Sequence, residues 1–238
     1  MQAFDSLSRD IQQYIYDKGW PSLTSIQNAA IKQVANTDHN LILSAPTASG
    51  KTEAAFIPAL NSVEDWETGL KVLYISPLKA LINDQFQRIS ELSEYLDIPI
   101  TRWHGEVSQA QKRKVVNQPK GVLLITPESI EGMLVNRPGE AQHLFKGVEW
   151  IIIDELHSFL GTERGIHLQS LLQRISRFMQ APRFIAMSAT LNKKDFGYAK
   201  AFFGSPRHTD ILVDRDKNDL FITIDYTSGE AGTFVARE

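Results

Sequence analysis

The sequence predicts a doubly wound α/β domain with a mainly parallel sheet, N-terminal helices and a short C-terminal extension. Short apolar runs alternate with segments of helical periodicity, which is typical of a parallel sheet whose strands are joined by crossover helices. Several runs are apolar almost throughout, as expected when helices cover both faces of a sheet. The chain has 238 residues, 42% of them hydrophobic, which is enough for one large domain with a substantial core.

The expected elements follow one another in a regular order. Two helices, Ser6–Lys18 and Ser25–Val34, precede the first strand. The expected strands are Leu41–Ser44, Val72–Ser76, Ile98–Trp103, Val122–Thr126, Trp150–Asp154 and Phe184–Ser188. Two further helices show apolar stripes at helical spacing, from Leu78 to Leu92 and from Leu168 to Met179. After about Asp210 the pattern changes, to a strand at Leu220–Tyr226 and a loop at 228–232.

Composition excludes several classes of protein. The chain has no cysteine, so it has neither disulfides nor thiolate metal sites. The first residues lack the basic and apolar blocks of a signal peptide, and no apolar run approaches membrane-spanning length. We therefore expect a cytoplasmic protein without a membrane partner. The formal net charge of −3 does not favour nucleic-acid binding by bulk charge, so such binding needs a local basic surface.

A phosphate-binding loop is the first chemical signal. The expected strand Leu41–Ser44 runs into Ala45-Pro46-Thr47-Ala48-Ser49-Gly50-Lys51-Thr52, and a helical stretch follows. This is close to G-x-x-x-x-G-K-[ST] in the strand–loop–helix setting that the motif requires. The backbone N–H groups of Thr47, Ala48, Ser49 and Gly50 would curl around phosphate oxygens at a helix N-terminus. Lys51 would reach the β- and γ-phosphates, and the Thr52 hydroxyl would bind Mg²⁺.

The loop departs from the strict motif at its first position, where Ala45 replaces glycine. The structural alternative is a turn of small residues capped by Ser49. We favour the phosphate loop, because a lysine at the first turn of a helix opposes the helix dipole and needs another reason to be there.

An acidic pair is the second signal. The apolar run Trp150–Ile153 ends in Asp154 and Glu155, and strand ends face the ligand crevice in a doubly wound sheet. Asp154 would hold Mg²⁺ through water, and Glu155 would orient or deprotonate the attacking water. The alternative is a helix start with acidic residues in its first turn, which the upstream phosphate loop makes less favourable.

Ordered motifs extend these two signals to most of the chain. Asp154-Glu155-Leu156-His157 resembles the DExH box of superfamily-two helicases. Other motifs of that family's first RecA-like, P-loop domain occur in the correct order: Gly19-Trp20 with Leu23–Gln27 (the Q-type motif), Ser76–Leu81 (Ia), Thr126–Ser129 (Ib) and Ser188–Thr190 (III). Trp103-His104-Gly105 and Gly161–Gly165 look most like the Lhr-type branch. The resemblance covers roughly Gly19 to Gly204, and departs at Ala48, where the family usually has glycine.

The resemblance implies roles for single residues around ATP. Gln27 would contact adenine, whose N6 donor and N7 acceptor match a carboxamide. The alternative is a capping box, because Thr24 and Gln27 fit [ST]-x-x-[EQ]. Catalysis would involve Lys51, Asp154, Glu155 and His157. Ser188 and Thr190 would couple hydrolysis to movement of the nucleic acid, with His157 joining them to the acidic pair.

The resemblance also implies a single-stranded DNA or RNA partner that is gripped mostly by its backbone. Ser76-Pro77 and Thr126-Pro127 each place a hydroxyl cap before a proline at a helix start, which also presents N–H groups to phosphates. The expected contacts are Ser76, Pro77, Lys79, Arg88, His104, Thr126, Glu128 and Ser129. We interpret Trp103 as a core residue and Lys112-Arg113-Lys114 as a solvated face. His39, His143 and His167 show no metal-ligand spacing and are assigned no function.

The family's second RecA-like domain, with its arginine fingers, has no counterpart in these residues. We expect N-terminal helices with the Q-type motif in 1–36, the ATP-binding domain in 37–208, and a linker or the start of the second domain in 209–238. The predicted function is that of an ATP-dependent helicase or translocase, with ATP and Mg²⁺ as cofactors. The alternatives are a non-catalytic nucleic-acid-binding or scaffolding subunit and the motor part of a nuclease or defence complex.

Overall fold

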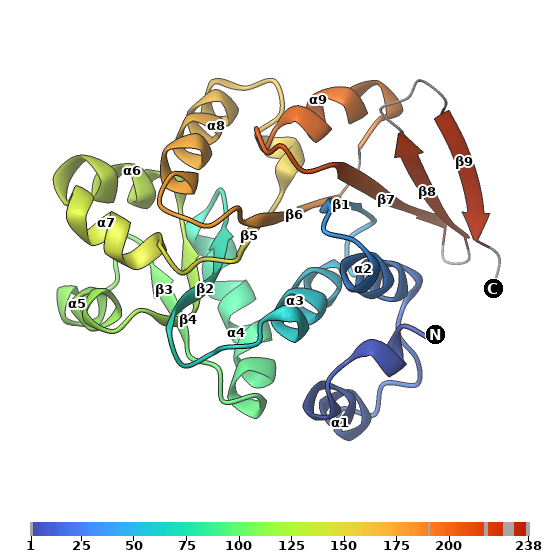
Figure 1. The fold of residues 1–238 in the computed structure, drawn as a ribbon, viewed down its shortest axis with the longest axis horizontal. Coiled ribbons are helices and arrows are strands. Elements are labelled where there is room, and N and C mark those ends of the chain that lie inside the picture. The colour runs from blue at the N-terminus through green and yellow to red at the C-terminus, as the bar shows by residue number, and fades with distance from the viewer. Residues whose placement is uncertain (1, 190, 217–218, 226–230, 237–238) are drawn as a thin grey trace. The chain divides into compact units, whose positions relative to one another are not determined.

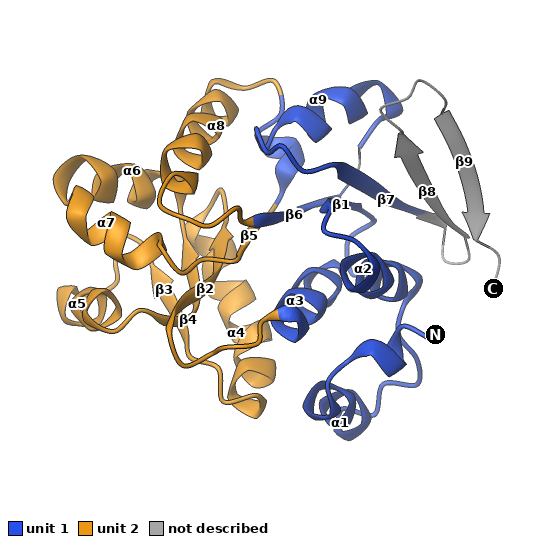
Figure 2. Cartoon of the chain, viewed as in Figure 1, with its two compact units in different colours: residues 1–62, 155–160, 183–238 blue, residues 63–154, 161–182 orange. Residues whose placement is uncertain are grey.

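The computed structural model describes residues 2–189, 191–216, 219–225 and 231–236, and Figure 1 shows their helices and strands in chain order. Contacts divide the chain into two compact units (Figure 2). Unit 1 consists of residues 1–62, 155–160 and 183–238, and unit 2 consists of residues 63–154 and 161–182. This division follows contacts rather than chain order. The expected boundaries at 36/37 and 208/209 stay predictions.

Unit 2 contains parallel strands in the order β3-β4-β2-β5. The strands are β2 (Gly69–Ile75), β3 (Ile100–Trp103), β4 (Lys120–Ile125) and β5 (Trp150–Ile153). The helices are α4 (Lys79–Tyr95), α5 (Gln109–Asn117), α6 (Pro127–Asn136), α7 (Pro138–Phe145) and α8 (Glu163–Ser176). All four residues of β5 are buried, as expected for a parallel strand covered on both faces.

Unit 1 contains strands in the order β6-β1-β7-β8-β9. The strands are β1 (Asn40–Ser44), β6 (Arg183–Ser188), β7 (Thr209–Asp216), β8 (Asp219–Asp225) and β9 (Ala231–Ala236). The helical segments are η1 (Phe4–Ser6), α1 (Arg9–Asp17), α2 (Ser25–Asn36), α3 (Lys51–Ser62), η2 (Leu156–Ser158), η3 (Lys193–Asp195) and α9 (Phe196–Ala201). Strand β1 pairs in parallel with β6 and β7, whereas β8 is antiparallel to both β7 and β9.

A buried asparagine ties the starts of three strands in unit 1. Asn40 is fully buried, and its Oδ1 accepts a hydrogen bond from the Phe184 backbone N–H at 3.0 Å. Its Nδ2 lies 3.4 Å from Oγ1 of Thr209. Because a buried amide must satisfy its donors and acceptors inside the protein, Asn40 holds β1 in register with both neighbours. That register sets the two ends of β1, where the site residues lie.

All six expected core strands are present, each shifted by at most a few residues. The pairs that these strands form within each unit are parallel, as expected, and the antiparallel pairs β7–β8 and β8–β9 follow in unit 1. Residues 220–225 of the expected strand belong to β8, and Tyr226 lies outside the described residues. The parallel strand β7 was missed, because Asp210 and Asp214 interrupt its apolar pattern. Ala231 and Gly232, expected in a loop, belong to β9.

The expected hydroxyl caps have different outcomes. Thr126 caps α6, since its side chain accepts from the Ser129 N–H and Pro127 occupies the first turn. The cap expected at Ser76 is wrong: α4 begins only at Lys79, after Leu78, which makes no side-chain cap. Ser76 is fully buried at the end of β2, and a residue before proline favours extended backbone. The chain therefore stays extended past Ser76 before the helix starts.

Among the described residues, no helix combines the length and the apolar character that a membrane span requires.

Candidate nucleotide site and nucleic-acid interface

The loop between β1 and α3 has the conformation of a tight, left-handed turn. Ala48 has φ 63° and Gly50 has φ 84°, a region that glycine adopts freely and alanine does not. The ammonium of Lys51 donates to the carbonyls of Ala45 and Pro46, each at 2.6 Å. Ser49 Oγ is buried and makes no hydrogen bond among the described residues. The alternative interpretation, a turn that the Ser49 side chain caps, is therefore wrong. The loop thus presents its lysine over its own backbone at the first turn of α3.

Gln27 contacts this loop from α2. The expected capping box is present: the Gln27 side chain accepts from the Thr24 N–H at 2.9 Å, and Thr24 Oγ1 accepts from the Gln27 N–H at 3.4 Å. In addition, Gln27 Nε2 donates to the Gly50 carbonyl at 3.4 Å, and Thr24 Oγ1 donates to the Ser49 carbonyl at 3.2 Å. The box therefore holds both the start of α2 and the loop, and the adenine contact of Gln27 stays a prediction.

Glu155, His157 and Ser188 form a contact chain in unit 1. His157 Nδ1 lies 3.2 Å from Glu155 Oε2 and 3.3 Å from Ser188 Oγ. Glu155 has φ 48° and ψ 47°, a left-handed conformation that costs a non-glycine residue about 1 kcal/mol or more. Such strain at a polar residue is typical of functional sites. His157 thus contacts one residue of the acidic pair, Glu155, and one residue of the expected coupling motif, Ser188.

Ser188 also reaches the strand that carries the phosphate loop. Its carbonyl accepts from the Ala45 N–H at 3.2 Å, and Ser44 Oγ accepts from the Leu191 N–H at 3.1 Å. The carboxyl ends of β1 and β6 are therefore joined where the loop begins. Within unit 1, hydrogen bonds and ion pairs lead from the loop through Ser188 and His157 to Glu155. Thr190 lies outside the described residues.

Asp154 belongs to unit 2 and directly precedes Glu155 in the chain. It is 6% exposed, and its N–H donates to the Ile75 carbonyl at 2.9 Å. Its Oδ2 accepts a hydrogen bond from the hydroxyl of Tyr74, which is fully buried on β2. The sequence showed Tyr74 only as one more residue of a buried strand, and no sequence signal linked it to Asp154. The carboxylate is thereby held in one orientation by a neighbouring strand.

Arg164 joins two of the segments expected to bind nucleic acid. Its guanidinium donates from Nε and Nη2 to Glu128 Oε1, at 3.0 and 2.6 Å, and from Nη2 also to the Pro77 carbonyl. Arg164 is the second residue of α8, whose N-cap is Thr162. In the sequence, Arg164 was recognised only as part of the Lhr-type segment Gly161–Gly165, and no role was predicted for it. A planar guanidinium that forms several directed bonds fixes the positions of both partners.

The remaining expected nucleic-acid contacts differ in their surroundings. Lys79 forms an ion pair with Glu106, whose pKa this hydrogen bond and charge lower. Arg88 is exposed on α4. Thr126 Oγ1 and Ser129 Oγ lie 3.1 Å apart, at the helix start that would face a phosphate. The roles of these residues stay predictions.

His104 is buried although neither ring nitrogen has a hydrogen-bond partner among the described residues. Burial lowers the pKa of its imidazole, and the charge of Arg102 adds to the effect while Glu106 opposes it. The preceding Trp103 is 7% exposed, so its interpretation as a core residue is confirmed. The ammonium of Lys112 lies 5.7 Å from the centre of the Trp103 ring.

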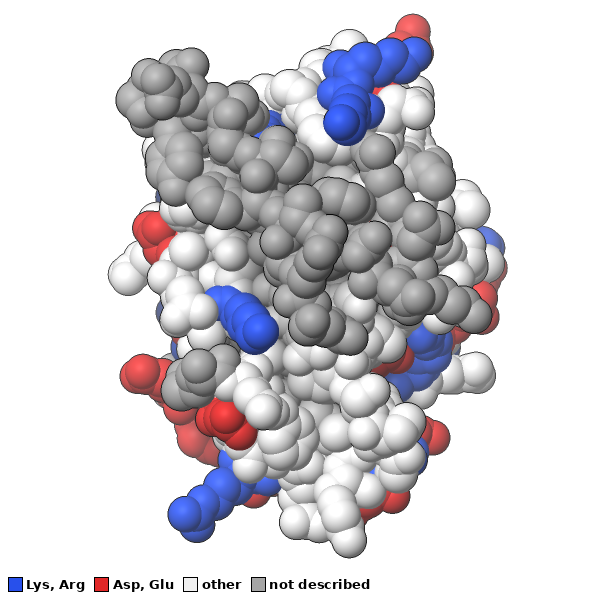
Figure 3. Space-filling model, turned by 90° about the vertical axis from the view of Figure 1, so that its right-hand side faces the viewer, with Lys and Arg blue, Asp and Glu red and all other residues white. Residues whose placement is uncertain are grey.

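A cavity of about 450 Å³ in unit 2 is lined by Phe86, Arg102, Val115 and neighbouring residues, and by none of the predicted site residues. Its walls come from α4, β3, α5 and the segments beside them. On the face shown in Figure 3, the described basic and acidic side chains are interspersed rather than gathered into one patch.

Known proteins resemble this chain in sequence. Residues 24–196 match the family described as DEAD/DEAH box helicase. The chain is 30% identical over 209 residues to the ATP-dependent helicase Lhr-Core of Methanocaldococcus jannaschii, covering 80% of this chain and 24% of that protein. It is 32% identical over 214 residues to the Lhr helicase/uracil glycosylase of Escherichia coli, covering 79% of this chain and 13% of that protein.

Solved structures show the same fold. The helicase Lhr of Mycobacterium smegmatis, bound to single-stranded DNA and AMP-PNP, has a TM-score of 0.78 at 27% identity, covering 90% of this chain and 28% of that one. The DUF1998 helicase MrfA, bound to DNA and AMP-PNP, has a TM-score of 0.76 at 26% identity, covering 92% of this chain and 31% of that one. The fold is therefore the RecA-like helicase fold that the motifs implied, and the chain spans about a quarter or less of the two curated relatives.

Proposed function

We propose that this chain, which belongs to the DEAD/DEAH box helicase family, is the ATP-binding motor domain of a helicase or translocase that moves along single-stranded nucleic acid. Of the two curated relatives named above, one is named as an ATP-dependent helicase and the other as a helicase/uracil glycosylase, and both are several times longer than this chain. The activity, substrate and partners of the whole protein are part of the proposal.

The contact chain from the phosphate loop to Glu155 carries this proposal. Phosphoryl transfer to water needs a group that orients the attacking water beside the triphosphate. In unit 1, Ser188 bonds to the start of the loop and His157 contacts both Ser188 and Glu155. The left-handed backbone of Glu155 is energetically unfavourable, and strain of this kind is typical of functional sites rather than of purely structural turns. We assign Glu155 the role of orienting the attacking water. His157 and Ser188 would hold Glu155 in place and couple hydrolysis to movement of the nucleic acid.

Each unit also contains one of the oxygen donors expected to bind magnesium, Thr52 in unit 1 and Asp154 in unit 2. Mg²⁺ prefers hard oxygen donors, and the expected ligands are the Thr52 hydroxyl and the Asp154 carboxylate, which are both buried. A bound Mg²⁺ would supply positive charge that stabilises the negative charge of the triphosphate during phosphoryl transfer. Lys51 would leave the two loop carbonyls to bind phosphate oxygens, which are stronger acceptors because they are charged. Gln27 would add the adenine contact while its capping box holds the loop.

We place nucleic acid on the segments that Arg164 joins in unit 2. Thr126 and Ser129 lie at the start of α6, where the positive end of the helix dipole suits a phosphate, and Arg164 holds Glu128 and Pro77 beside them. Two relatives are named as bound to DNA, so DNA is the first substrate to test and RNA the second. Completion of the ATPase site would need an arginine finger from a second RecA-like domain, so we expect slow hydrolysis by this chain alone.

The test is nucleic-acid-stimulated ATP hydrolysis by the full-length protein that contains this chain. We expect Lys51→Ala to abolish ATP binding, measured with a fluorescent ATP analogue. Glu155→Gln should keep binding and lower the hydrolysis rate by about 10²-fold or more. Lys32→Ala, a change of an exposed lysine on α2, is the matched control and should leave both measurements unchanged.

Two results would contradict the proposal. A Glu155→Gln protein that hydrolyses ATP at the normal rate removes the catalytic role of the contact chain. A full-length protein that binds single-stranded DNA and RNA but hydrolyses ATP with neither identifies a non-catalytic binding subunit instead.

A further inference from the structure

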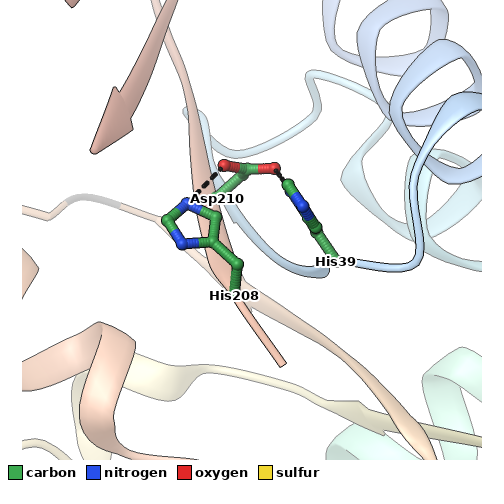
Figure 4. Close-up of side chains that lie close together, drawn as sticks. All are labelled: His39, His208 and Asp210. Atoms are coloured by element: carbon green, nitrogen blue, oxygen red, sulfur yellow. Dashed lines mark hydrogen bonds and ion pairs between the residues drawn. The ribbon is translucent and has the colours of Figure 1, made fainter. Parts of the chain in front are cut away.

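Three donor side chains meet at the start of β1 and β7 (Figure 4). Strand pairing brings them together: Asn40 lies opposite Thr209, and the Asn40 N–H donates to the His208 carbonyl at 2.8 Å. The residues just before the two strands, His39 and His208, are therefore neighbours. Asp210 lies two residues after His208, on the same side of β7. Residues separated by 171 positions in the chain thus share one site.

The carboxylate at the centre of this cluster is completely buried. The side chain of Asp210 has no exposed surface. Its Oδ2 accepts from Gln33 Nε2 at 2.5 Å and contacts His39 Nδ1 at 2.8 Å. No lysine or arginine contacts it within the part of the chain that the structure describes. A buried carboxylate without a cation is costly, so this position favours binding of positive charge.

Two buried atoms in the cluster lack hydrogen bonds. Asp210 Oδ1 and His208 Nε2 lie 3.1 Å apart, but they do not form a hydrogen bond, and neither has another partner among the described residues. Buried polar atoms are normally satisfied, and each exception needs a physical reason. A cation that accepts electron pairs from both atoms would satisfy them together.

The spacing of the donor atoms fits a small transition-metal ion. Metal–ligand bonds of 2.0 to 2.2 Å in a tetrahedral site place neighbouring donors roughly 3.3 to 3.6 Å apart. The donor atoms of His39, His208 and Asp210 all lie within 4.8 Å of one another, and the two contacts to Asp210 measure 2.8 and 3.1 Å. Small side-chain rotations bring all three to binding distance. The histidine side chains are 31% and 25% exposed, so a water can complete the coordination.

We infer that His39, His208 and Asp210 bind a divalent transition-metal ion of the zinc class. Two imidazoles and one carboxylate form a donor set that zinc and its neighbours prefer over magnesium or calcium. Gln33, which donates to the carboxylate, and Arg183, which donates to the His39 carbonyl at 2.9 Å, orient these ligands from outside.

The role of this ion is structural. The cluster lies at the amino end of β1, and the phosphate loop leaves from the carboxyl end of that strand, about 15 Å away at 3.3 Å per residue. The metal ligands touch no residue that we assign to ATP. The bound ion clips β7 to β1, and it is independent of the magnesium expected beside Thr52.

The test is titration of the untagged, metal-free chain with ZnCl₂ by calorimetry, and with Co²⁺ by visible absorption. We expect one tight site, a tetrahedral Co²⁺ spectrum, and a melting temperature raised by about 5 °C at a hundredfold excess over Kd. His39→Gln and His208→Gln should each lower the affinity by at least about tenfold. Using both variants keeps the test valid if one of them fails to fold.

His143→Gln is the matched control, because His143 is an exposed histidine of α7 outside the cluster, and it should bind zinc normally. His157→Gln checks the other histidine that has a carboxylate neighbour in unit 1. Absence of zinc binding, or binding that is lost in His157→Gln and kept in His208→Gln, overturns the inference.

Discussion

The hydroxyl of Tyr74 on β2 donates a hydrogen bond to Oδ2 of Asp154, the residue that follows β5. Tyr74 is fully buried and Asp154 nearly so. The carboxylate expected to hold Mg²⁺ therefore depends on a residue 80 positions earlier in the chain. Hydrogen bonds of this kind orient metal ligands and raise the affinity of the site for its ion.

Tyr74→Phe removes this hydroxyl and keeps the ring that fills the core. We expect ATP hydrolysis by the full-length protein to fall about 10-fold and the Mg²⁺ concentration for half-maximal activity to rise, because Asp154 is less well oriented. Steady-state ATPase assays over a range of Mg²⁺ concentrations measure both. Tyr198→Phe, at an exposed tyrosine, is the control. An unchanged Mg²⁺ dependence in Tyr74→Phe would show that the hydrogen bond has no part in metal binding.

The left-handed backbone conformation of Ala48 predicts that replacing it with glycine stabilises the folded chain. Ala48→Gly should raise the free energy of unfolding by about 0.5 to 1 kcal/mol, because glycine adopts φ 63° without the steric cost that alanine incurs. Ala110→Gly, on exposed helix α5, should lower it by about 1 kcal/mol. Urea denaturation measures both. If Ala48→Gly destabilises the chain as much as Ala110→Gly does, the loop does not have this conformation.

At Gly50, in contrast to Ala48, glycine is already present and a side chain would be unfavourable. A Cβ on Gly50 would lie 2.5 Å from Gln27 Nε2, and the residue has φ 84°. We expect Gly50→Ala to displace Gln27 and weaken binding of a fluorescent ATP analogue by about 10-fold or more. Gly132→Ala, at a helical position of α6 with open space around it, should bind normally. Normal ATP binding by Gly50→Ala would show that the contact of Gln27 with the loop does not matter.

His104 makes stability depend on pH. Its pKa is lowered from 6.5 in the folded protein, mainly by burial, so the unfolded chain binds the proton more readily. Stability from this group is therefore complete above about pH 6.5 and is lost as the pH falls through the lower folded pKa. Denaturation midpoints compared at about pH 7.5 and about pH 5.5 should differ less in His104→Gln than in the unchanged chain. His143→Gln should show no such reduction, and an equal reduction in both would contradict this assignment.

Arg164 should matter for nucleic acid rather than for ATP. Arg164→Lys keeps the positive charge but removes the guanidinium group that donates hydrogen bonds to Glu128 and to the Pro77 carbonyl. We therefore expect the affinity of the full-length protein for single-stranded DNA to fall about 10-fold. Fluorescence anisotropy measures this affinity. Arg113→Lys, an exposed residue of α5, is the control. ATP binding without DNA should not change in either variant, and equal DNA affinities would remove the positioning role of Arg164.

Local signals in the sequence were sufficient for much of the fold. Apolar runs predicted six strands because parallel strands covered by helices are buried throughout. Two helix starts were predicted correctly, one from the capping box of Thr24 and Gln27 and one from Thr126 before a proline. These features depend on residues a few positions apart, whose geometry the backbone determines directly. The same reasoning failed at Ser76, where burial at the strand end overrides the capping preference of the hydroxyl.

The sequence by itself determined the strand–loop–helix of the phosphate loop, the acidic pair after a buried strand, and the order of the motifs. Only the tertiary structure decided which distant residues support them: Tyr74 at Asp154, Arg164 between Pro77 and Glu128, and His39 beside His208 and Asp210. The physical reason is that strand pairing and helix packing join positions far apart in the chain. No local spacing of residue types carries that register, so histidines without metal-ligand spacing in the sequence come to share one carboxylate in the fold.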